Sequence, residues 1–157
     1  MDVSYQIVSF FYHLSLIVWL GGIITIGFVA APALFKTLSS RTQAGEVASV
    51  IHRRFQVIQL VCMVVLLVSS AVILRVWENM DTPVVIRYLL IFDMVVLAVF
   101  HSTVVMKKLR LIRQGIPSFD NVSPSDPKIA EFKRWHQISV IVSLAILVSG
   151  LGALFLS

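Results

Sequence analysis

Four long runs of apolar residues constrain this chain more than any other feature. They cover residues 5–35, 55–74, 84–106 and 137–156, and the 157-residue chain is 58% hydrophobic and only 13% charged. A soluble domain of this size is about 25% charged, whereas a helix of about 20 consecutive apolar residues crosses a bilayer. The sequence therefore predicts an all-α fold, an integral membrane four-helix transmembrane bundle that forms a single domain over residues 1–157.

The connections refine where the helices begin. Asp126 and Pro127 suit the N-cap and the first position of the last helix, which therefore begins before its apolar run. The stretch 45–54 favours a short amphipathic helix that leads into the second span. We therefore expect helices at about residues 5–35, 55–74, 84–106 and 127–156.

The basic residues predict an orientation. The first and third connections contain 11 of the 13 lysines and arginines: Lys36, Arg41, Arg53, Arg54, Lys107, Lys108, Arg110, Arg113, Lys128, Lys133 and Arg134. The positive-inside rule then places both basic loops in the cytoplasm and both termini on the non-cytoplasmic side of the cell (inner) membrane. Because these charges follow the ends of apolar runs, we expect them to attract anionic inner-leaflet lipids, with no role in nucleic-acid binding.

Small residues indicate how the helices pack. Lipid gives apolar helices no hydrophobic drive to associate, so close contact needs small side chains. Two groups of such residues stand in the first and last helices: Gly21, Gly22, Gly27 and Ala31, and Ala145, Ser149 and Ala153. They predict packing within one bundle, and the alternative is a homodimer face.

Two ionisable residues near one predicted depth form the first candidate site. Such residues are costly inside a bilayer, so each is a functional candidate. His13 lies about 12 Å from the outer end of the first helix and Asp93 about 13 Å from that of the third. We expect the two to pair, with Asp93 orienting a His13 metal or haem ligand or acting in a proton relay. The alternative is a purely structural pair.

The second candidate site lies on the inner side. His101 is about 8 Å deep in the third helix, His52 precedes the second span, His136 begins the fourth, and Cys62 is near the depth of His101. Three imidazoles and a thiol from three helices could converge on copper, another transition metal or haem iron. The alternative is that His52 and His136 are only interfacial. Of the three inner histidines, His101 is the strongest candidate because it is the deepest.

The sequence also resembles known membrane families. His13, Trp19-Leu20-Gly21-Gly22 and the 31–35 segment Ala-Pro-Ala-Leu-Phe resemble the transmembrane protein 205-like family, as do the 52–55 segment His-Arg-Arg-Phe and the segment from Asp126 to Leu144. That resemblance implies a four-helix membrane domain of unknown biochemical function.

The spacing of His13, Trp19, Gly21 and Gly22 is also similar to that of CopD-like copper-resistance proteins and, more loosely, of HemJ-like haem-pathway proteins. This similarity implies a role in ligand binding for His13. Asp93 and His101 are not part of the pattern shared with these families.

These observations favour one function and leave two alternatives. The leading hypothesis is a haem- or metal-binding membrane protein, in which His101 with His52 or His136, or else His13, ligates haem b or an ion such as copper. The alternatives are a metal-ion or small-cation transport component acting as a dimer and a non-catalytic assembly scaffold. No P-loop, Gly-x-Ser-x-Gly, His-Glu-x-x-His or Cys-x-x-Cys motif indicates an enzyme.

Overall fold

Four long apolar helical segments make up the fold. The computed structural model describes residues 2–123 and 126–157. Each of the four segments is long and apolar enough to cross a membrane: Val3–Thr37, Arg41–Val76, Thr82–Gln114 and Pro127–Phe155. The predicted all-α class with four membrane-spanning helices is therefore confirmed.

Two of the four segments contain a π-helical turn. The first consists of α1 (Val3–Ile24), η1 (Thr25–Ala30) and α2 (Ala31–Thr37), and the third of α4 (Thr82–Phe100), η2 (His101–Val105) and α5 (Met106–Gln114). The other two are uninterrupted: α3 (Arg41–Val76) and α6 (Pro127–Phe155).

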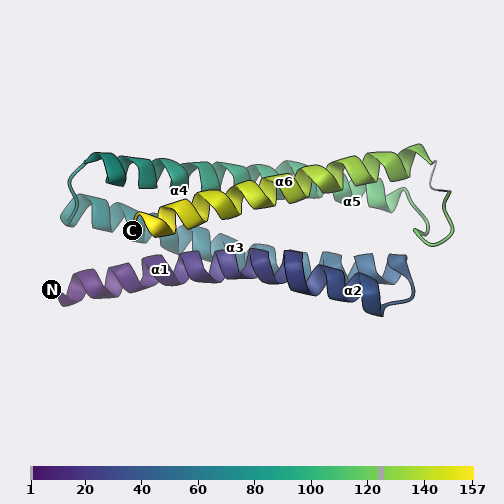
Figure 1. The fold of residues 1–157 in the computed structure, drawn as a ribbon, viewed down its shortest axis with the longest axis horizontal. Coiled ribbons are helices and arrows are strands. Elements are labelled where there is room, and N and C mark those ends of the chain that lie inside the picture. Colours follow the sequence, from purple (N-terminus) through teal and green to yellow (C-terminus); the bar gives the residue numbers. More distant parts are fainter. Residues whose placement is uncertain (1, 124–125) are drawn as a thin grey trace.

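The helices pack as two antiparallel pairs, α1 with α3 and α4 with α6, and α6 also contacts α1 (Figure 1). Both termini and the α3–α4 connection lie at one end, which we call the termini end. The α2–α3 and α5–α6 connections lie at the other end, which we call the basic end because 11 of the 13 lysines and arginines belong to the connections there. Fully buried large side chains join the pairs in one core: Leu16, Trp19, Leu66, Met94 and Ile146.

Helix boundaries differ from the prediction mainly at the basic end. The expected amphipathic helix and second span are one continuous helix of 36 residues, α3. The third helical segment continues beyond residue 106 as α5, whose strongly amphipathic sequence suits a membrane surface. The predicted start of α6 is confirmed, because the Asp126 side chain accepts a hydrogen bond from the backbone N–H of Lys128 at 2.8 Å.

Proline explains the first π-helical turn. Pro32 lies in the first turn of α2, inside a helical segment that continues without a break. Its ring cannot donate a backbone hydrogen bond and collides with the carbonyl four residues earlier in a regular α-helix. The wider turn η1 directly before it is one of the known ways for a helix to continue past such a defect.

Asp120 ties the α5–α6 connection to the start of α3. Its carboxylate accepts hydrogen bonds from the Ser40 hydroxyl at 2.7 Å and from the Arg41 backbone N–H at 2.6 Å. These bonds, the Ser40 one foremost, hold the pKa of Asp120 below its ordinary value. The α2–α3 and α5–α6 connections are thereby held together at the basic end, although Ser40 and Asp120 lie 80 residues apart in sequence.

Glycines let the helices approach one another within the bundle. A Cβ atom at Gly22 would lie 2.0 Å from the Phe55 ring of α3, and one at Gly150 would lie 2.4 Å from the Leu20 side chain of α1. Gly21, by contrast, has no such neighbour within 4 Å. Gly22 and Gly150 therefore serve packing within one bundle.

The difference between Gly21 and Gly22 gives a test of this packing. We expect Gly22→Ala to destabilise the bundle by about 1–3 kcal/mol, because the Phe55 ring must move. Gly21→Ala should instead be neutral or slightly stabilising, because alanine favours helix more than glycine does. Thermal unfolding of both variants in one detergent measures the difference, and equal unfolding temperatures would contradict the packing described here.

Candidate functional site

Two histidines meet inside the basic half of the bundle. His52 comes from α3 and His101 from the first position of η2, and their ring centroids lie 5.6 Å apart in an edge-to-face arrangement. His101 is buried, and its Nε2 atom lies 2.8 Å from the Ser139 hydroxyl oxygen of α6. The Nε2 atom of His52 is buried and has no hydrogen-bond partner among the described residues. Three helices thus build one small polar site.

Local hydrogen bonding explains why the π-helical turn η2 begins at His101. The hydroxyls of Ser102 and Thr103 both donate to the backbone carbonyl of Val99, at 3.0 and 2.6 Å. Such bonds compete with the regular helical pattern and bend a helix. Single π-helical turns are often found at functional sites. This one sets the direction in which the His101 side chain points from its helix.

The other inner candidates do not join this pair. His136 is exposed and stacks on the Phe132 ring, with 6.2 Å between centroids, and Cys62 is buried in the apolar core. The described residues contain no group of three or more His, Cys, Asp or Glu side chains placed to hold a metal ion. The expected convergence of three imidazoles and a thiol is therefore wrong. One reason is that His52 and Cys62 share the continuous helix α3, in which ten residues separate them by about 15 Å.

The expected pair of His13 and Asp93 is also not formed. The His13 Nδ1 atom donates to the backbone carbonyl of Ser9 at 2.7 Å, and its Nε2 atom lies 3.1 Å from the Ser157 hydroxyl. Asp93 is exposed on the outside of α4 and accepts a hydrogen bond from the Ser149 hydroxyl of α6 at 2.7 Å. The sequence predicts similar depths for His13 and Asp93. The rotation of α4 about its axis, however, turns the Asp93 carboxylate toward α6 and away from α1.

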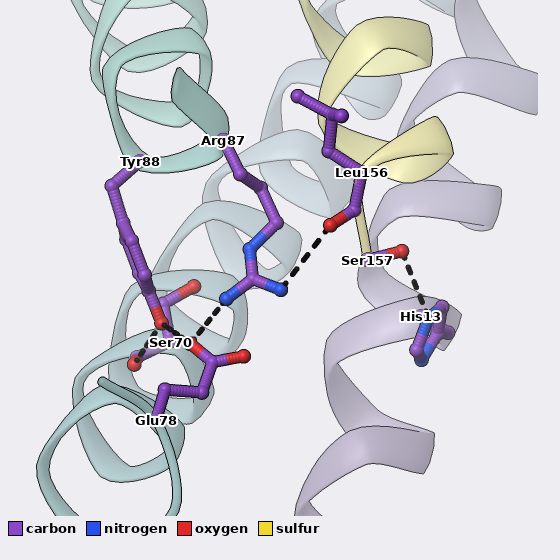
Figure 2. Close-up of polar contacts among 7 residues, drawn as sticks. All are labelled: His13, Ser70, Glu78, Arg87, Tyr88, Leu156 and Ser157. Carbon is purple, nitrogen blue, oxygen red and sulfur yellow. Dashed lines mark hydrogen bonds and ion pairs between the residues drawn. The ribbon is translucent and has the colours of Figure 1, made fainter. Parts of the chain in front are cut away.

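An unpredicted polar cluster lies at the termini end, around Arg87 of α4 (Figure 2). This side chain is buried and forms an ion pair with Glu78, which stands in the α3–α4 connection. It also donates to the backbone carbonyl of Leu156 at the end of α6, at 3.5 Å. The hydroxyl of Tyr88 lies 3.0 Å from both the Glu78 carboxylate and the backbone carbonyl of Ser70. The cluster therefore links α3, α4 and α6.

Aromatic rings complete the surroundings of Arg87. Its guanidinium carbon lies 4.9 Å from the ring centroid of Tyr88 and 5.9 Å from that of Tyr12. Such cation–π contacts strengthen when water is excluded. The Tyr12 hydroxyl, the Arg87 Nε atom and the Ser70 hydroxyl are buried without a hydrogen-bond partner among the described residues. Polar groups of this kind are usually satisfied by buried water.

The sequence-based prediction missed this cluster because it counted Arg87 only as one of the two basic residues outside the first and third connections. The signal was present, since Arg87 stands inside the apolar run 84–106 and any ionisable residue there is a functional candidate. Glu78 gave no comparable signal, because it lies in a polar connection. Only the fold of that connection brings the carboxylate back over α4.

Comparison with known proteins identifies a family. Residues 14–115, which are 102 of the 157 residues, match the family described as a domain of unknown function, DUF4149. The chain therefore belongs to this family. The matched region contains His52, His101 and the Arg87–Glu78 pair. Comparisons with curated proteins and with solved structures gave no match.

The Arg87 cluster predicts a large difference between two arginines of the termini end. We expect Arg87→Ala to lower the free energy of unfolding by about 3–5 kcal/mol, because it leaves Glu78 without its partner in a partly buried site. Arg75→Ala is the control: this arginine is exposed, and its loss should cost less than about 0.5 kcal/mol. Thermal unfolding in detergent measures both, and similar losses for the two variants would refute the role given to Arg87.

Proposed function

We propose that this member of the DUF4149 family binds a transition-metal ion, copper or zinc, between His52 and His101 inside the membrane. The observation that carries the proposal is the buried Nε2 atom of His52, which has no hydrogen-bond partner among the described residues and stands beside a second imidazole. A buried polar atom without a partner costs free energy. Neutral imidazole nitrogens are ligands that copper and zinc prefer.

The spacing of the two rings supports a shared ion. Imidazole nitrogens lie about 2.0–2.1 Å from zinc, which places two ring centroids that share one ion about 5–6 Å apart, and the observed separation is 5.6 Å. The Ser139 hydroxyl bonds one nitrogen of His101 and so orients the ring, as outer partners of metal-binding histidines do. Two protein ligands leave coordination positions open for small molecules, which suits metal handling more than a closed structural site.

Haem is the less favoured ligand for this pair. Cofactor sites usually have volumes of about 300–1,000 Å³. Two cavities in the described part of the chain measure about 50 and 200 Å³, and neither is lined by His52 or His101. The histidine pair therefore suits a metal ion more than a haem macrocycle. By the positive-inside rule, we place the basic end, and with it the histidine pair, on the cytoplasmic side.

Metal titration of detergent-purified protein tests the proposal. We expect wild-type protein to retain about one equivalent of Cu²⁺ or Zn²⁺ after dialysis, and His52→Ala or His101→Ala to abolish this retention. Ser139→Ala should weaken binding by about 10–100-fold, as loss of an outer partner does. Elemental analysis of the dialysed protein provides the measurement.

His136→Ala is the matched control, because this histidine stacks on Phe132 away from the pair. If this variant loses as much metal as His52→Ala, or if no variant changes occupancy, the site is wrongly assigned. A visible Soret band that disappears in His101→Ala would show that the pair binds haem and would overturn the proposal of an ion.

A second candidate function, cation transport by a dimer, is favoured by the exposure of Asp93. This carboxyl lies mid-span on the outside of α4, where Ser149 supplies its hydrogen bond. A carboxyl that faces lipid is costly, and four helices are few for a transport path. We propose that a second copy packs against this face and removes both Asp93 carboxyls from lipid.

Substitution of Asp93 tests the dimer. We expect wild-type protein in mild detergent to be dimeric by light scattering, Asp93→Asn to remain so because an amide still forms hydrogen bonds, and Asp93→Leu to be monomeric. Phe92→Leu, at an exposed neighbouring position, is the control and should not change the mass. A monomeric wild type, or a dimer that persists in Asp93→Leu, would exclude this arrangement.

A further inference from the structure

A cavity of about 200 Å³ lies at the basic end, between the start of α3, the α5–α6 connection and the first turns of α6. Six residues line it: Arg41, Phe119, Val122, Ile129, Phe132 and Lys133. We propose that this cavity binds the anionic headgroup of a membrane lipid. The inference is independent of the histidine pair, which does not line the cavity.

Two cations give the cavity its charge. Arg41 is the first residue of α3, Lys133 belongs to α6, and both are exposed. Neither side chain forms an ion pair with any residue in the described part of the chain. The nearby carboxylate of Asp120 is already bonded to Ser40 and to the backbone N–H of Arg41. The cavity therefore offers an anion two cations whose side chains form no ion pair with the described residues.

The remaining walls are apolar, which distinguishes this cavity from a simple patch of surface charge. Phe119 and Phe132 contact each other edge to face at 5.0 Å between centroids, and Val122 and Ile129 are half-buried beside them. A water molecule occupies about 30 Å³, so the volume suits a phosphate with a few attached carbons. Acyl chains do not fit inside and must lie along the outer helix surface.

The position of the cavity along α6 selects a lipid over a soluble anion. The 29 residues of α6 span about 43 Å, whereas the hydrocarbon core is about 30 Å thick. Lys133 is the seventh residue of the helix, about 9 Å from its start, and therefore lies near headgroup level. Basic pockets between transmembrane helices at this level are known to receive anionic headgroups.

Lipid retention in detergent tests the site. Purified protein is mixed with phosphatidylglycerol or phosphatidylcholine and examined by native mass spectrometry. We expect wild-type protein to retain phosphatidylglycerol preferentially. The double variant Arg41→Gln/Lys133→Gln should weaken this retention by about 10–30-fold, because it removes both cations that line the cavity and each is worth roughly a fivefold factor in direct contact with a headgroup.

Lys107→Gln/Lys108→Gln is the matched control, because it removes the same charge from exposed positions of α5 at the same end. The proposal predicts unchanged retention in this variant. Equal losses in the two double variants, or equal retention of both lipids by wild-type protein, would refute a specific site.

Inorganic phosphate at millimolar concentration separates the two sources of the anion. If phosphate displaces phosphatidylglycerol or raises the unfolding temperature as much as the lipid does, the cavity binds a soluble anion and the lipid proposal fails. We expect neither effect. Because Arg41 and Lys133 are exposed, circular dichroism of the double variant should match that of wild-type protein, and the loss of retention then reports binding.

Discussion

The inability of lipid to form hydrogen bonds constrains every polar group in this bundle. Within the spans, most polar side chains accordingly have protein partners: Arg87 bonds Glu78, His101 bonds Ser139, and Asp93 bonds Ser149. The exceptions are informative, because a buried polar atom without a partner costs about 1–3 kcal/mol. Among the described residues they include the Trp19 Nε1 atom in the core, the His52 Nε2 atom at the basic end and the atoms around Arg87 at the termini end.

The two polar clusters have different consequences for the helices that carry them. Arg87 and His101 lie in one helical segment, 14 residues and about 21 Å apart. The Arg87 cluster is dense in bonds and fixes α3, α4 and α6 at the termini end. Among the described residues the histidine pair has one hydrogen bond, from His101 to Ser139, and His101 is the first residue of a π-helical turn. The first arrangement stabilises the fold, whereas the second leaves a nitrogen available for a ligand.

Hydropathy was sufficient to predict the number of spans, and the capping signal of Asp126 and Pro127 was sufficient to predict the start of α6, because each depends on local sequence. Side-chain partners were not predictable in the same way. The depth of Asp93 follows from counting residues. The direction of its side chain depends on how α4 is rotated relative to α6, and a π-helical turn or a connection changes that rotation. His52 was expected to be interfacial or to join a larger cluster; it became half of a pair because α3 continues without a break from Arg41.

The charges next to the histidine pair link the proposed metal site to the membrane around it. Arg53 and Arg54 directly follow His52 in α3 and are exposed, so their positive charge opposes the entry of a metal cation. Anionic headgroups at the same level compensate that charge, and compensation acts over roughly a Debye length of about 8 Å. With so many cations at one end of the bundle, surrounding phosphates favour the binding of a further cation between the two imidazoles that we propose as its ligands. The lipid would then be part of the electrostatic environment of the proposed site as well as its solvent.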